Sequence, residues 1–144
     1  GIATVAVSLD GAMIPMAGHE GWREAMVGTL SFYDHEGERQ HTLYLAAEPE
    51  YAKHTFTERM ACEIARAKQH YPDARWLGIA DGAASNWTFL EQHTERQLID
   101  FFHATEYIAK LAQPRYPRRK AEAKRAAWQQ AHCNRLKRDP RRAR

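Results

Sequence analysis

The chain has 144 residues, of which 44% are hydrophobic and 27% charged, so it fits one globular domain and a disordered chain is excluded. No run approaches the roughly 20 apolar residues of a membrane span, and no charged and then apolar segment begins the chain as a signal peptide would. The two cysteines, Cys62 and Cys133, are too few for a disulfide scaffold, and we expect a cytoplasmic protein.

The net charge of +3 conceals two parts of opposite sign. Residues 1–110 hold 9 Lys and Arg against 16 Asp and Glu, a net charge of −7, whereas residues 111–144 hold 12 against 2, a net charge of +10. A basic tail on an acidic body favours an anionic partner, most often nucleic acid. A tail that is merely solvated has the same composition, so charge alone leaves both interpretations open.

The first predicted strand covers residues 2–10, where apolar and polar residues alternate up to Leu9. It ends at Asp10, and residues 12–25 show no clear period, which predicts a loop. A hairpin follows, with strands over 27–33 and 39–47 joined by a short polar segment that contains glycine. The sequence therefore begins with three antiparallel strands.

The hydrophobic period then changes to that of a helix over about residues 50–71, which Pro72 ends. The next segment, 75–81, is apolar on both faces, as in a buried central strand, and it ends at Asp81. The residues after Asp81 predict a short helix over 84–93, a strand over 97–102 and a helix from 105 to 112. A break between Pro114 and Pro117 then precedes a basic helix over 118–137, which has a thin apolar stripe.

This order of elements predicts an α/β fold with a mixed sheet: three antiparallel strands, then a βαβ unit, with helices on its faces. The usual handedness of the crossover places the Asp81 strand parallel to the first strand and beside it. Asp10 and Asp81 would then meet at one edge of the sheet, where open α/β sheets have their sites. Paired carboxylates favour a hard cation such as Mg²⁺ or Mn²⁺, which assists phosphoryl transfer.

Ordinary turns are the alternative for both aspartates, because each is followed by glycine and Asp-Gly is a common turn pair. Asp100 and His103 come next along the chain, near the end of the following predicted strand. From their positions alone, we favour a structural pair that caps the next helix. Residues 22–24, Trp-Arg-Glu, fall in the predicted loop, either as functional residues or as an ordinary surface turn.

Several short motifs carry a resemblance to a known family. In chain order they are residues 7–11 (VSLDG), 21–24 (GWRE), 27–29 (VGT), 77–83 (LGIADGA) with Trp87, and 99–107 (IDFFHATEY). Residues 1 to about 112 resemble bacterial insertion-sequence transposases of the DDE class, nearest to the Kra-type group, a relative of Mutator-like transposases. The resemblance implies an RNase H-like catalytic core that cuts and joins DNA strands with two metal ions, Mg²⁺ or Mn²⁺.

By this resemblance, Asp10 and Asp81 match the first two metal-binding acids of the family, and Asp100 with His103 matches its Asp-x-x-His element near the catalytic site. The family's third acid is a glutamate that follows a helical insertion, and the chain ends at Arg144 without a match for it. We therefore expect a fragment truncated at both ends, inactive alone. Its domains would be a partial catalytic core, 1–113, and a basic helical segment that begins the insertion, 114–144.

The expected partner is DNA, both element ends and target, with no membrane. The residues expected to contact DNA phosphates are Arg115, Arg118, Arg119, Lys120, Lys124 and Arg125. A sheet that lacks its final helix leaves apolar surface open, which predicts low stability or a homo-oligomer. Two other functions stay open: an RNase H-type nuclease, and a non-catalytic nucleic-acid-binding module.

Overall fold

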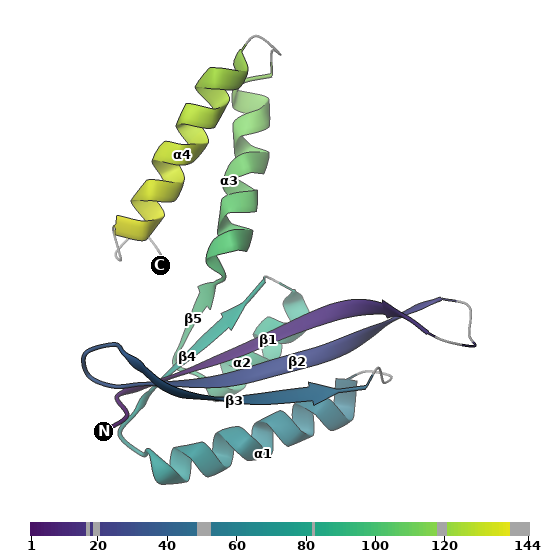
Figure 1. Ribbon diagram of the computed structural model, residues 1–144, viewed down its shortest axis with the longest axis vertical. Coiled ribbons are helices and arrows are strands. Elements are labelled where there is room, and N and C mark those ends of the chain that lie inside the picture. Colours follow the sequence, from purple (N-terminus) through teal and green to yellow (C-terminus); the bar gives the residue numbers. More distant parts are fainter. Residues whose placement is uncertain (17, 19–20, 49–52, 82, 118–120, 139–144) are drawn as a thin grey trace. The chain divides into compact units, whose positions relative to one another are not determined.

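The structure, a computed structural model, describes residues 1–16, 18, 21–48, 53–81, 83–117 and 121–138. The chain divides into two compact units, residues 1–97 and 98–144. The elements, drawn in Figure 1, are β1 (Thr4–Pro15), β2 (Trp22–Tyr33), β3 (Arg39–Ala47), α1 (His54–His70), β4 (Arg75–Ala80), α2 (Ala84–His93), β5 (Arg96–Ile99), α3 (Phe101–Arg115) and α4 (Glu122–Arg138).

The five strands form one mixed sheet in the order β3-β2-β1-β4-β5. β2 is antiparallel to both β1 and β3, whereas β4 is parallel to β1. Helix α1 follows β3 in the chain and leads across the sheet to β4. This is the sheet order of the RNase H-like fold, so the predicted fold class is confirmed, including the position of β4 beside β1. The predicted basic C-terminal extension, residues 114–144, is helical where the structure describes it, in the end of α3 and in α4.

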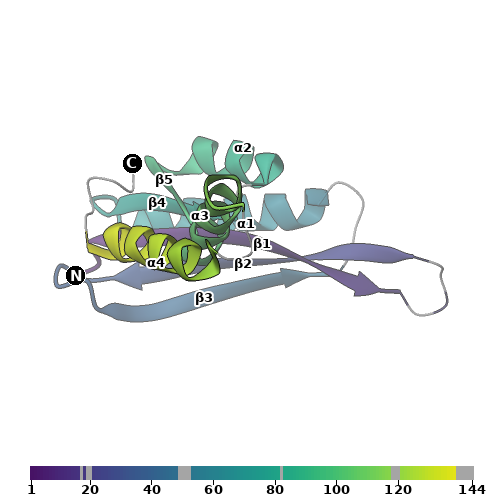
Figure 2. The ribbon, with the colours of Figure 1, turned by 90° about the horizontal axis from the view of Figure 1, so that it is seen from above.

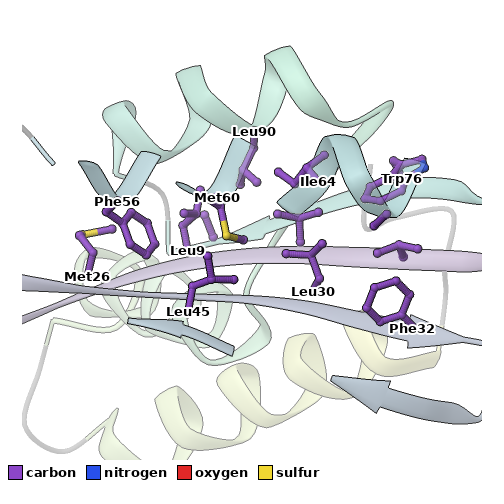
Figure 3. Close-up of a cluster of buried hydrophobic side chains, with 14 of the residues drawn as sticks. Leu9, Met26, Leu30, Phe32, Leu45, Phe56, Met60, Ile64, Trp76 and Leu90 are labelled. Atoms are coloured by element: carbon purple, nitrogen blue, oxygen red, sulfur yellow. The ribbon is translucent and has the colours of Figure 1, made fainter. Parts of the chain in front are cut away.

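Helices α1 and α2 cover the same face of the sheet, as Figure 2 shows. Between them and the strands lies the core of the first unit, drawn in Figure 3. The stripe that predicted α1 is the part of the helix that is buried: Phe56, Met60, Ile64 and Ala67. Gly28 lets this helix approach β2, because a Cβ at Gly28 would lie 2.9 Å from side-chain atoms of Met60 and Phe56.

The second face of the sheet differs in character from the helix-covered face. Its side chains alternate with the buried ones along each strand and are largely polar on β1, β2 and β3. Hydroxyl pairs link neighbouring strands there, Ser8 to Thr29 at 2.7 Å and Ser31 to Thr42 at 3.1 Å. No helix of the described part of residues 1–97 packs on this face.

The predicted loop over residues 12–25 is wrong. β1 continues through Asp10 to Pro15, and β2 already begins at Trp22, so the two strands pair over twelve positions. Asp10 therefore lies within a strand instead of ending it. The alternation that predicts strands was absent here because both faces of this pair are solvated: Met13, on one face, is 57% exposed, and Ile14, on the other, is 37% exposed.

The predicted strand over 97–102 and the predicted helix start at 105 are both shifted. β5 ends at Ile99, and α3 begins at Phe101 because Asp100 caps it. Pro114, which was predicted to begin a break, lies in the last turn of α3. The thin stripe predicted for the basic helix is confirmed, since α4 has no buried residue. None of the helices described is both long and apolar enough to cross a membrane.

Candidate metal site at the sheet edge

Asp10 and Asp81 are the residues that follow the last paired position of β1 and β4. Leu9 on β1 pairs in parallel register with Ala80, the last residue of β4, so the two aspartates are the next residues of neighbouring strands. Such strands are about 4.8 Å apart. The sequence-based prediction that the strands leading to these two aspartates are parallel neighbours is therefore confirmed.

Each of the two carboxylates is held by a neighbouring backbone N–H group. The N–H of Gly11 donates to Oδ1 of Asp10 at 2.8 Å, and the N–H of Ala83 donates to Oδ1 of Asp81 at 3.0 Å. Neither side chain forms an ion pair with any described residue. Asp10 is exposed and Asp81 is half-buried. Both carboxylates therefore have an Oδ2 that no described protein group occupies.

This pair of oxygen donors fits a hard cation that keeps most of its water ligands. Mg²⁺ is commonly bound through one or two carboxylates, with water and substrate phosphate as the other ligands. Among the described residues, no third Asp, Glu, His or Cys joins the pair in a cluster that could hold a metal. The described site therefore has two protein ligands at most.

Asp100 and His103 begin helix α3, in the unit of residues 98–144. Oδ1 of Asp100 accepts hydrogen bonds from the N–H groups of Phe102, at 2.8 Å, and His103, at 3.3 Å, and lies 3.3 Å from Nδ1 of His103. The side chain thus satisfies donors that a helix start leaves without partners. This is the capping arrangement that the positions of the two residues favoured.

Trp22, Arg23 and Glu24 lie at the start of β2, not in a loop. The Glu24 carboxylate forms a 2.8 Å ion pair with Nζ of Lys53, the residue before α1, and it lies over Gly11, where a Cβ would collide with it. Sequence reasoning missed Lys53 because the ion pair joins positions far apart in the chain, and no local pattern signals it.

The predicted DNA contacts fall partly outside the described residues. Arg115 ends α3, Lys124 and Arg125 lie in the first turns of α4, and Arg118, Arg119 and Lys120 lie outside the described residues. Arg115 and Lys124 are exposed and Arg125 is half-buried. The three described cations are thus at least partly accessible to a ligand.

A hollow of about 910 Å³ lies elsewhere, on the second face at the other end of β1 and β4. Its lining includes Ala6, Leu77 and Ile79 from the strands, together with Asp73 and the β2–β3 turn. It contains neither Asp10 nor Asp81, so the acid pair lies outside it.

A scan against models of protein families found no match, and neither did a search of curated proteins.

Proposed function

We propose that this chain is part of the catalytic core of a DDE-type transposase of the Kra-type group, which cuts and joins DNA strands during transposition. The observation that carries the proposal is the register of Leu9 with Ala80, which makes Asp10 and Asp81 neighbours at the end of β4. The RNase H-like sheet order and the motifs around these aspartates support the same function.

Asp10 and Asp81 would hold Mg²⁺ or Mn²⁺ through their carboxylate oxygens. A metal pair in such a site lowers the pKa of an attacking water or hydroxyl and stabilises the leaving oxygen at a phosphate. The chain's own part is to fix two carboxylates on neighbouring strands and to orient them through the N–H groups of Gly11 and Ala83. Asp100 and His103 act in this proposal as the helix cap of α3 and not as ligands.

DNA is the proposed partner, through sequence-independent contacts of the basic unit. Residues 98–144 hold 13 Lys and Arg against 4 Asp and Glu, a net charge of +9. Cations on helices α3 and α4 would neutralise backbone phosphates and position the duplex. Base-specific recognition of element ends is not part of this proposal.

Metal binding by the acid pair is tested by Mn²⁺, a paramagnetic ion that broadens nearby amide signals in an NMR spectrum. We expect Mn²⁺ to broaden the signals of Gly11 and Ala83 selectively in the wild-type chain. Asp10→Asn and Asp81→Asn should each abolish that broadening. Asp73→Asn, which removes an exposed carboxylate at the other end of β4, should leave it unchanged. Broadening that persists in both site variants would overturn the proposed site.

Cleavage is tested with the same variants on duplex DNA in the presence of Mn²⁺. Two carboxylates without a third protein ligand hold a metal pair poorly, so we expect no multiple turnover from the 144-residue polypeptide. Robust nicking that Asp10→Asn abolishes would contradict this expectation of inactivity. Hydrolysis of an RNA–DNA hybrid in preference to duplex DNA would favour an RNase H-type nuclease instead.

A non-catalytic nucleic-acid-binding module is the second candidate, and the observation that favours it is the +9 charge of residues 98–144. DNA binding by a chain whose acid pair does not bind Mn²⁺ would select this candidate over the transposase core.

A further inference from the structure

The paired ends of β1 and β2 extend beyond the rest of the sheet as a two-stranded arm, which consists of Gly11–Pro15 and Trp22–Ala25. Figure 1 shows this arm projecting past β3 and β4. The pairing with β4 ends at Leu9, and the pairing with β3 ends at Met26. The arm therefore begins next to Asp10, and its residues 12–15 and 22–23 are exposed.

The base of the arm is fixed on the helix-covered side. Glu24 lies over Gly11 and reaches Lys53 at 2.8 Å, which ties β2 to the residue that precedes α1. Gly11 leaves room for this arrangement because it has no side chain. The ion pair is half-buried, with 23% of the Lys53 side chain and 37% of the Glu24 side chain exposed. The direction of the arm relative to the acid pair is thus constrained by a specific contact.

The opposite side of the arm continues the face to which Asp10 belongs. Alternation along the strands places Ala12 and Ile14 on that face of β1, and the register pairs them with Ala25 and Arg23. Two small alanines therefore separate Asp10 from Arg23 on this surface. Arg23 is four residues beyond Val27, the partner of Asp10, which corresponds to roughly 13 Å along the strand.

Arg23 is the cation of this surface. Its side chain is exposed and forms no ion pair with any described residue. It belongs to a unit with 8 Lys and Arg against 14 Asp and Glu, a net charge of −6, which repels DNA as a whole. An arginine also presents a planar fork of donors that matches a phosphate. A cation placed in line with the acid pair is thus suited to hold a polyanion against the arm.

We propose that Arg23 binds a backbone phosphate of the DNA strand whose reacting phosphate lies at Asp10 and Asp81. The alanine pair lets the DNA backbone lie close to the arm, and roughly 13 Å corresponds to the rise of about four base pairs along the axis of B-form DNA. This inference rests on the proposed function, and it assigns the arginine of the Trp22–Glu24 motif a positioning role. Trp22, on the other side of the ribbon, takes no part in it.

The test is the salt dependence of binding to a labelled mixed-sequence duplex of about 20 base pairs, without metal. Arg23→Gln should weaken binding about 3- to 10-fold at low salt. It should also make the negative slope of log K against log salt shallower by about 0.9, the value for one phosphate. Arg23→Lys keeps the charge and should restore the slope. Arg59→Gln, which removes an exposed cation from α1, makes the same charge change away from the arm and should leave the slope unchanged.

Two results would overturn the inference. One is an Arg23→Gln slope equal to that of the wild type. The other is a loss of affinity in Trp22→Ala as large as that in Arg23→Gln, which would indicate base stacking or a structural effect of the arm. The Mn²⁺ measurement is made without DNA, so failure of the metal site and failure of the Arg23 contact are observed separately.

Discussion

Asp100 shows how a single residue can satisfy either a family pattern or a local structural need. The Asp-x-x-His spacing puts one polar side chain at the N-cap of α3 and the other in its first turn, where free N–H groups need acceptors. One carboxylate oxygen meets the N–H groups of Phe102 and His103 and also lies near the imidazole. The same geometry orients His103, so the pair is built as a cap.

The capping role predicts different effects for two substitutions. Asp100→Asn keeps a side-chain acceptor and should change the free energy of unfolding little, whereas Asp100→Ala should lower it by about 1 kcal/mol. Urea unfolding followed by circular dichroism measures both. Mn²⁺ broadening at Gly11 should be the same in the two variants. Loss of that broadening in Asp100→Asn would instead make Asp100 a metal ligand.

At the scale of elements, the β2–β3 hairpin carries its own acid-sensitive contact. Oδ1 of Asp34 accepts hydrogen bonds from the N–H groups of Glu38, at 2.9 Å, and Glu36, at 3.0 Å, and its other oxygen accepts one from the Gln40 amide. These bonds, the one from Glu38 first, lower the pKa of the Asp34 carboxyl below its ordinary value of 3.8. The ionised carboxylate is thus the form that the turn binds.

The sign of the pH effect follows from that direction. Because the pKa of Asp34 is lower in the folded turn, the unfolded chain binds the proton more readily, and the stabilisation is complete above about pH 3.8. It is lost as the pH falls through the folded pKa. We expect the amide signals of Glu36 and Glu38 to titrate together with the Asp34 carboxyl in an NMR series. In Asp34→Asn the low-pH transition should vanish from both amides, and its persistence would contradict the assignment.

The elements that the sequence predicted are those whose side chains divide between core and solvent. The stripe of α1 and the alternation before Asp10 both record burial on one side, and the structure has them as expected. The arm was missed because neither of its faces is buried, so nothing selects apolar residues at every second position. The shifted start of α3 has another cause, since a capping side chain, rather than a hydrophobic period, fixes that boundary.

The candidate site was also only partly predictable from the sequence. The handedness of a crossover is general, so the neighbouring positions of Asp10 and Asp81 followed from the order of elements. The ion pair of Glu24 with Lys53 and the position of Arg23 on the Asp10 face depend on the register of β1 with β2. That register continues through the arm. The residues of that segment show no periodic pattern, so the register could not be predicted from the sequence and is seen only in the structure.

At the scale of the whole molecule, charge is divided between the two compact units, −6 in residues 1–97 and +9 in residues 98–144. A chain with this division should bind DNA through the second unit, and its net charge of +3 is a poor guide to affinity. DNA binding through local contacts depends on where each cation lies, whereas attraction by net charge depends only on how many cations there are. The two causes therefore predict different effects when cations of different units are removed.

Two triple variants with the same change in net charge separate these causes. One triple variant, with Arg115→Gln, Lys124→Gln and Arg125→Gln, removes described cations of α3 and α4. We expect the negative slope of log K against log salt to become shallower by up to about 2.7, because each phosphate that is no longer neutralised contributes about 0.9. Replacing Arg39, Arg59 and Arg66 by Gln in the first unit should leave the slope nearly unchanged. Equal decreases of the slope in the two triple variants would mean that net charge alone attracts DNA. Wild-type affinity that does not change between low and moderate salt would exclude phosphate binding by either unit, because each neutralised phosphate releases counterions.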